Sequence, residues 1–245
     1  ALRITALGVY EASLNGSRVG DFILAPGWTV YQKRLQVQQY DLQICPGQEN
    51  ELTVVVGAGW YRGRLAGWLP DQNGNAALPA ALTAELTLRY PDGHADTICT
   101  DASWQTAESA VRFSELYDGE TYDAAFEPSV WTPAALYDGP TDTLIEQQGE
   151  PVREQERIAP ARIFKTPAGE TVVDFGQNLT GYVEIALDGV KGEAVELSHA
   201  EVLDKNGNFY TENYRSAKAK YLYFCKDGAQ RYKPKLTFYG FRYIR

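Results

Sequence analysis

Short runs of alternating apolar and polar residues, each ended by a turn signal, constrain this 245-residue chain most strongly. Such runs recur at spacings of roughly ten residues, as in 6–14, 35–42, 82–90 and 236–244. Asn-Gly and Asp-Gly pairs, which tolerate the positive φ of tight hairpins, separate several of them. Helical periodicity is scarce. We therefore predict an all-β fold of two antiparallel β-sandwich (jelly-roll-like) domains.

A polar and charged stretch over residues 146–160, with prolines at 151 and 160, interrupts the series of expected strands. A new series begins at 163–166. Linkers between domains have this composition, and the chain is long enough for two cores. We expect one domain over 1–146 and a second over 147–245.

Charge and cysteine content narrow the classes of partner. The formal net charge of −9 argues against nucleic acid and against an anionic membrane surface. No apolar run reaches the ~18 residues of a membrane span. Three widely spaced cysteines and two histidines predict neither a disulfide framework nor a zinc site, and they favour a reducing compartment.

Two segments, 57–68 and 114–123, combine aromatic rings with charged side chains. A sugar needs this pairing, because its C–H faces stack on rings while its hydroxyls bind polar groups. A structural alternative, rings and Arg packed in a core, stays open. The candidate carbohydrate contacts are Trp60, Tyr61, Arg62, Trp68, Tyr117, Asp118, Glu120, Tyr122 and Asp123.

Catalytic motifs are absent from the sequence: no nucleophile elbow, zinc-protease motif or P-loop occurs. His199 and Glu201 stand two apart and would project from one face of a strand, which makes an acid–base pair or a plain polar pair conceivable. The carboxylates of 115–123 could serve a sugar hydrolase only if two of them flanked one bond. We assign no catalytic residue.

Calcium is the one cofactor that the residues leave open, and we expect none to be required. The stretches 71–75 and 204–208 begin like a calcium loop but lack the glutamate at the twelfth position, so hairpin turns are favoured. A calcium site of another geometry would use Asp71, Asn73 and Asn75.

Several segments together resemble the β domains that precede the catalytic domain in bacterial α-L-rhamnosidases. In order, they are 6–16 (ALGVYEASLNG), 24–31 (LAPGWTVY), 59–63 (GWYRG), 117–124 (YDGETYDA), 174–178 (DFGQN), 199–204 (HAEVLD) and 238–244 (FYGFRYI). The resemblance covers nearly the whole chain. It implies a parent enzyme that releases terminal α-L-rhamnose with inversion, using an (α/α)₆ barrel that this sequence lacks.

The resemblance therefore implies a non-catalytic fragment, inactive alone, that binds rhamnose-containing carbohydrate and supports the barrel of the same polypeptide. Contacts with the barrel would involve Asp174, Gln177, Asn178, His199 and Glu201. A purely structural or dimerising scaffold without a sugar site is the alternative, and a homodimer stays open. The chain starts without Met and inside a strand, so we expect it to be excised from a longer protein. We expect the bacterial cytoplasm rather than secretion, although a signal peptide could have been removed.

Overall fold

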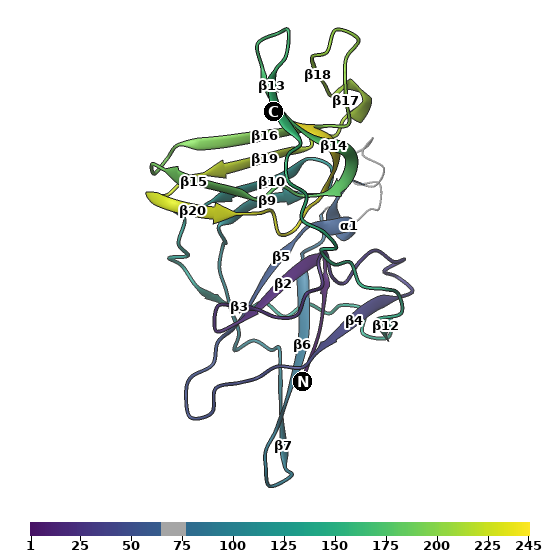
Figure 1. Ribbon diagram of the computed structural model, residues 1–245. Helices are drawn as coiled ribbons and strands as arrows, with labels where there is room; N and C mark the ends of the chain where they lie inside the picture. Colours follow the sequence, from purple (N-terminus) through teal and green to yellow (C-terminus); the bar gives the residue numbers. More distant parts are fainter. Residues whose placement is uncertain (65–76) are drawn as a thin grey trace. The chain divides into compact units, whose positions relative to one another are not determined.

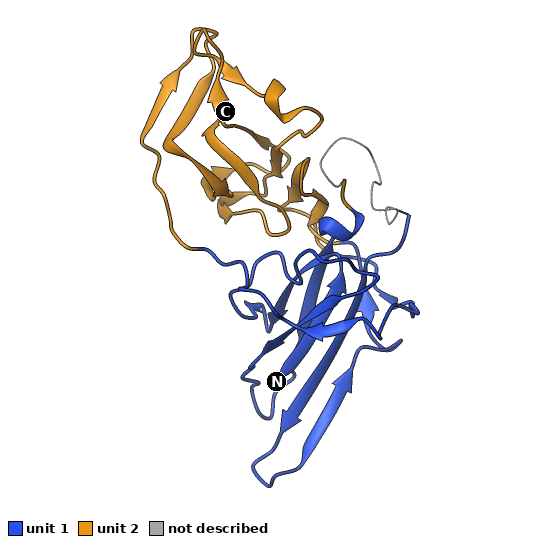
Figure 2. Cartoon of the chain, turned by 90° about the vertical axis from the view of Figure 1, so that its right-hand side faces the viewer, with its two compact units in different colours: residues 1–62, 74–108, 128–154 blue, residues 63–73, 109–127, 155–245 orange. Residues whose placement is uncertain are grey.

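The computed structural model describes residues 1–64 and 77–245, and those residues form strands almost throughout (Figure 1). The chain divides into two compact units (Figure 2). Unit 1 comprises 1–62, 74–108 and 128–154, and unit 2 comprises 63–73, 109–127 and 155–245. A single division at 146 does not describe these units, because residues 109–127 supply two strands to the sheet of unit 2.

Unit 1 contains two main sheets. The five-stranded sheet has the order β12 (Leu144–Glu146), β4 (Leu35–Tyr40), β1 (Leu2–Leu7), β6 (Ala81–Arg89) and β7 (Ala95–Cys99). The three-stranded sheet has the order β3 (Ser17–Arg18), β2 (Val9–Leu14) and β5 (Leu52–Gly57). The short pair β8 (Gln105–Thr106) and β11 (Thr132–Pro133) and the helical turn α1 (Gly59–Arg62) complete the unit.

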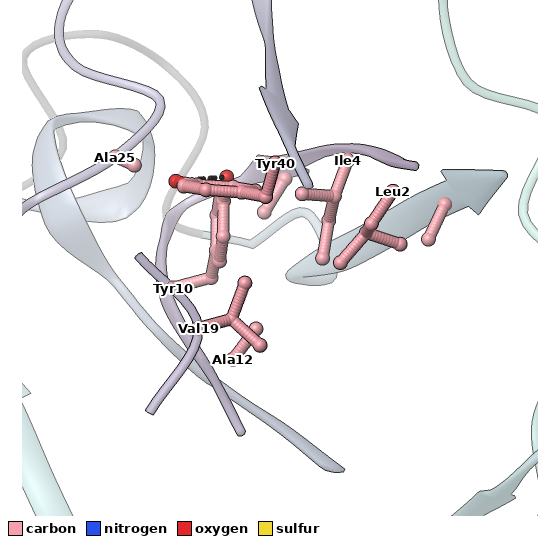
Figure 3. Packing of buried hydrophobic residues seen from close by; sticks show 9 residues of the cluster. Leu2, Ile4, Tyr10, Ala12, Val19, Ala25 and Tyr40 are labelled. Carbon is pink, nitrogen blue, oxygen red and sulfur yellow. Dashed lines mark hydrogen bonds between the residues drawn. The ribbon is translucent and has the colours of Figure 1, made fainter. Parts of the chain in front are cut away.

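The core of unit 1 contains residues from both of these sheets, as a sandwich requires. Alternate residues of β1, Leu2 and Ile4 among them, pack in one cluster with Tyr10 of β2 and Tyr40 of β4 (Figure 3). The two tyrosine hydroxyls lie 3.2 Å apart, and Tyr10 also donates to Oε1 of Gln38 at 3.0 Å. These bonds satisfy polar groups that would otherwise be costly to bury.

Unit 2 is built on a seven-stranded sheet. Its order is β13 (Arg162–Lys165), β14 (Thr171–Gly181), β21 (Tyr239–Ile244), β16 (Ala194–Ala200), β19 (Lys220–Phe224), β10 (Gly119–Asp123) and β9 (Val111–Glu115). The pairs β15 (Ile185–Gly189) with β20 (Gly228–Tyr232) and β17 (Val202–Leu203) with β18 (Phe209–Tyr210), and the 3₁₀ turn η2 (Glu212–Tyr214), complete it. Most pairs are antiparallel, but β10–β19 in unit 2 and β12–β4 in unit 1 are parallel.

Tyrosine dominates the core of unit 2. Tyr221 and Tyr223 of β19 pack with Tyr232 of β20 and with Tyr239 and Phe241 of β21. Each buried ring removes a large apolar area from water, which stabilises the unit.

Candidate functional site

The aromatic residues of α1, expected to contact sugar, lie against the core of unit 1. Tyr61 is buried and meets the ring of Tyr31 edge-on, with centroids 5.2 Å apart. Trp60 is half-buried against the same cluster, and Arg62 is half-buried at the end of the turn. Gly59 adopts φ +53°, where an added Cβ would lie 2.6 Å from Val9. This arrangement fits the structural alternative of packed rings.

Glu120, another expected sugar contact, is 1% exposed in the core of unit 2. Its carboxylate accepts a hydrogen bond from the Tyr232 hydroxyl at 2.7 Å and from the backbone N–H groups of Lys235 and Leu236, each at 3.1 Å. Burial raises the pKa of Glu120 above its usual value. Tyr122 stacks on Tyr232 with ring centroids 3.8 Å apart. Glu120 and Tyr122 are therefore both part of the packed core of unit 2.

The loop of Tyr117 and Asp118 is organised from within unit 2. Glu115 accepts from the backbone N–H groups of Arg64, Tyr117 and Asp118 at 2.9, 2.7 and 2.8 Å. Asp118 pairs with the Arg64 guanidinium, and Lys218 Nζ lies 3.7 Å away. Asp118 therefore has cationic partners of its own within the unit.

The remaining expected contacts of this group that the structure describes, Tyr117 and Asp123, are both half-buried. Asp123 accepts the Ala125 N–H at 2.9 Å. Trp68, like the calcium candidates Asp71, Asn73 and Asn75, lies outside the described residues.

Asp174, expected at a domain contact, is clamped within unit 2. Its carboxylate accepts from Arg242 at 2.8 and 3.1 Å, from Arg162 at 3.1 Å and from the Gly176 N–H at 2.8 Å. These partners lower the pKa of Asp174 from 3.8 to about 2, and the hydrogen bonds from Arg242 make the largest contribution. The register of β14 against β21 shifts just after this residue, and Gly176 adopts φ +81° there. Asp174 thus stabilises a β-bulge, a feature that re-aims side chains.

His199 and Glu201 do not form the acid–base pair that their spacing permits. His199 is fully buried, stacks on Tyr239 at 3.8 Å, and places Nδ1 2.8 Å from the Ala219 carbonyl oxygen. Desolvation lowers the pKa of His199 from 6.5 to about 4, so the ring is neutral at pH 7. Glu201 lies past the end of β16. The alternation of side chains along a strand, which predicted a shared face with His199, therefore does not extend to it.

Glu201 instead joins a polar cluster with side chains from two other segments. It accepts from Asn178 Nδ2 at 3.2 Å and from Asn213 Nδ2 at 3.1 Å. Asn178 lies within the bulged stretch of β14, between Asp174 and Leu179, and Asn213 lies in η2. Gln177 and Asn178 are exposed, so these two and Glu201, unlike His199 and Asp174, lie at the surface of unit 2.

Unit 1 also contains a hollow of about 130 Å³ that the sequence did not predict. Its lining includes Phe22 and Pro26 from the segment after β3, Gln36 of β4, and Gln147 and Val152 from the segment after β12. More than a hundred residues separate Gln36 from Gln147 along the chain, and isolated glutamines carry no motif. Only the parallel pairing of β12 with β4 brings them together.

Neither a metal centre nor a membrane-crossing helix occurs in residues 1–64 and 77–245. No three His, Cys, Asp or Glu side chains there are grouped to hold an ion. No helix in that part of the chain is long and apolar enough to span a bilayer.

The two units, each built from β-sheets around a core with buried tyrosines, define an all-β protein. Comparison with known proteins identifies its family. The model of the α-L-rhamnosidase N-terminal domain matches residues 1–156, and that of the bacterial α-L-rhamnosidase concanavalin-like domain matches 164–245. The chain therefore belongs to the α-L-rhamnosidase family.

The similarity extends to full-length relatives. An α-L-rhamnosidase of Streptomyces avermitilis is 39% identical over 99% of this chain and 25% of its own length. Its crystal structure in complex with L-rhamnose matches with a TM-score of 0.91, again over 99% of this chain and 25% of that one. The native enzyme of Aspergillus terreus matches with a TM-score of 0.86 at 34% identity, over 100% of this chain and 29% of that one. The chain thus spans about a quarter of the length of these relatives.

Proposed function

We propose that this chain is the non-catalytic β region of an α-L-rhamnosidase, a glycosidase that releases terminal α-L-rhamnose from glycosides. Unit 1 binds rhamnose-containing carbohydrate, and unit 2 supports the catalytic domain of the same polypeptide. One observation carries the proposal: the chain aligns end to end with a quarter of much longer rhamnosidases. The rest of each relative leaves room for a catalytic domain.

Surface chemistry supports the role proposed for unit 2. Gln177, Asn178 and Glu201 present amide and carboxylate groups, and Asn213 helps to fix the carboxylate. Ile163 of β13, with 66% of its surface exposed, adds an apolar contact on the same unit. A polar set already ordered by internal bonds loses little entropy when another domain covers it.

The alternative, a structural scaffold without a sugar site, draws on the packing of Tyr61, Glu120 and Tyr122. Calorimetric titration of the chain with L-rhamnose, in calcium and in EDTA, separates the two functions. Saturable binding supports the proposal, and a difference between the two buffers would implicate the calcium candidates. A flat titration at tens of millimolar favours the scaffold. Turnover of an aryl α-L-rhamnoside by the chain alone would contradict the non-catalytic role.

A further inference from the structure

Residues 109–127 lie in unit 2, although the chain reaches them from unit 1 and returns to unit 1 after them (Figure 2). They contain the hairpin β9–β10, and β10 pairs in parallel with β19 over Gly119–Asp123. The family model of the N-terminal domain covers this hairpin, whereas the concanavalin-like model, over 164–245, covers β19. The seven-stranded sheet of unit 2 is therefore completed by two strands that belong to the other family model.

Side chains of the hairpin fill part of the core of unit 2. The Glu120 carboxylate accepts one hydrogen bond from the Tyr232 hydroxyl and two from the backbone N–H groups of residues 235 and 236. The Tyr122 ring stacks on the rings of Tyr232 and Tyr223, with centroids 3.8 and 5.7 Å apart. Without the hairpin, these donors lose their acceptor and these rings lose a stacking partner, so the packing of residues 155–245 depends on it.

The backbone of the hairpin also fits closely against β19. The Lys220 N–H donates to the Asp118 carbonyl oxygen at 3.0 Å, and the Ala124 N–H donates to the Phe224 carbonyl oxygen at 2.9 Å. Between these bonds Gly119 adopts φ +107°, and an added Cβ would overlap the Lys220 carbonyl oxygen. Only glycine fits at this position. The site on β19 therefore recognises a strand with glycine at the closest approach, followed by a carboxylate and an aromatic ring.

We propose that residues 155–245 form an acceptor for the β9–β10 hairpin, and that the bound hairpin holds this part of the chain to residues 1–154 even when the peptide link between them is broken. The ligand of this acceptor is a segment of its own chain, and the inference is independent of the sugar-binding function proposed for unit 1. It implies that residues 155–245 do not fold without the hairpin. The boundary between the two family models is then not a boundary between folding units.

A site-specific protease tests the proposal in the full chain. Its recognition sequence is inserted between Glu154 and Gln155, where unit 1 ends and unit 2 resumes and where the insertion interrupts neither β12 nor β13. Cleavage leaves fragments 1–154 and 155–245, and size-exclusion chromatography at about 1 µM shows whether they stay joined. Hydrogen exchange of the β10 amides reports whether the hairpin remains paired.

Three substitutions in the cleavable chain distinguish the hairpin from other contacts. Gly119→Ala blocks the close approach to β19. Gly228→Ala is the matched control, because φ there is +86° and nothing lies within 4 Å of an added Cβ. Both changes place alanine in the left-handed region at a similar cost, so the overlap is what differs between them. Glu120→Gln changes the buried carboxylate without a backbone clash, and it decides the test if Gly119→Ala does not fold.

We expect the cleaved unmodified chain to elute as one species with the β10 amides still protected. Gly119→Ala should release 155–245 as an unfolded fragment, whereas Gly228→Ala should stay joined. Glu120→Gln should raise the dissociation constant of the two fragments at least about tenfold, since buried donors lose their acceptor.

Two kinds of result would overturn the proposal. The first is separation of the unmodified fragments at the concentration used. The second is equal retention by Gly119→Ala and Gly228→Ala, or an unchanged dissociation constant for Glu120→Gln, because contacts other than those of the hairpin would then hold the fragments together.

Discussion

Burial of His199 makes unit 2 sensitive to acid. In the fold, the ring lies between the aromatic side chains of Tyr239 and Phe241, and only Nδ1 has a described partner, the Ala219 carbonyl. The pKa is about 4 in the fold against 6.5 for a solvated histidine. Between these values the unfolded chain binds a proton that the folded chain does not. Stability is therefore lost as pH falls from 6.5 to about 4, and no loss from this group occurs above 6.5.

The size of this loss follows from the same pKa difference. Lowering the pKa from 6.5 to about 4 corresponds to about 3 kcal/mol of unfolding free energy. His199→Gln keeps a donor for Ala219 but cannot titrate. Hydrogen exchange of the β16 and β19 amides from about pH 7 to pH 4 reports unit 2 separately, after correction for intrinsic exchange.

Comparison with the variant removes the contribution of the carboxylates, which titrate in the same range. The unmodified chain should lose about 3 kcal/mol more than His199→Gln over this range. Equal losses in the two proteins would refute the reasoning that desolvation holds this ring neutral.

Three further substitutions test the placement of other residues. Asp174→Asn should destabilise unit 2 by about 3 kcal/mol in urea unfolding, because Arg242 loses a buried charged partner; Asp188→Asn at an exposed position should change little, and equal effects would contradict the clamp. Glu120→Gln should cost about 2 kcal/mol, since its amide offers N–H groups where backbone donors need an acceptor; an unchanged urea midpoint would argue against a buried carboxylate. Tyr61→Ala should cost about 3 kcal/mol and leave rhamnose affinity unchanged once folding is corrected for; lost affinity in a stable variant would restore it as a sugar contact.

The all-β fold was predictable because its signal is local. Alternation in 82–90 corresponds to β6, and the Asn-Gly pair at 15–16 turns between β2 and β3. The contribution of residues 109–127 to the sheet of unit 2 was not predictable. It depends on the parallel pairing of β10 with β19, between residues about a hundred positions apart in sequence.

Side-chain roles were less predictable than strands. An acidic residue between tyrosines has the same sequence pattern whether it binds a sugar or, like Glu120, is buried beneath a hydroxyl and two N–H groups. The HAE motif indicated a shared face for His199 and Glu201, but the strand ends at Ala200 and the two residues separate. Gln36 and Gln147 gave no signal, since only the fold makes them neighbours.

The central claim, that this chain is the carbohydrate-binding and non-catalytic part of a rhamnosidase, is tested most directly by calorimetric titration of the 245-residue chain with L-rhamnose. Saturable binding in the millimolar range, without turnover of an aryl α-L-rhamnoside by the same sample, is the predicted result. A flat titration up to tens of millimolar would contradict the claim and leave a scaffold.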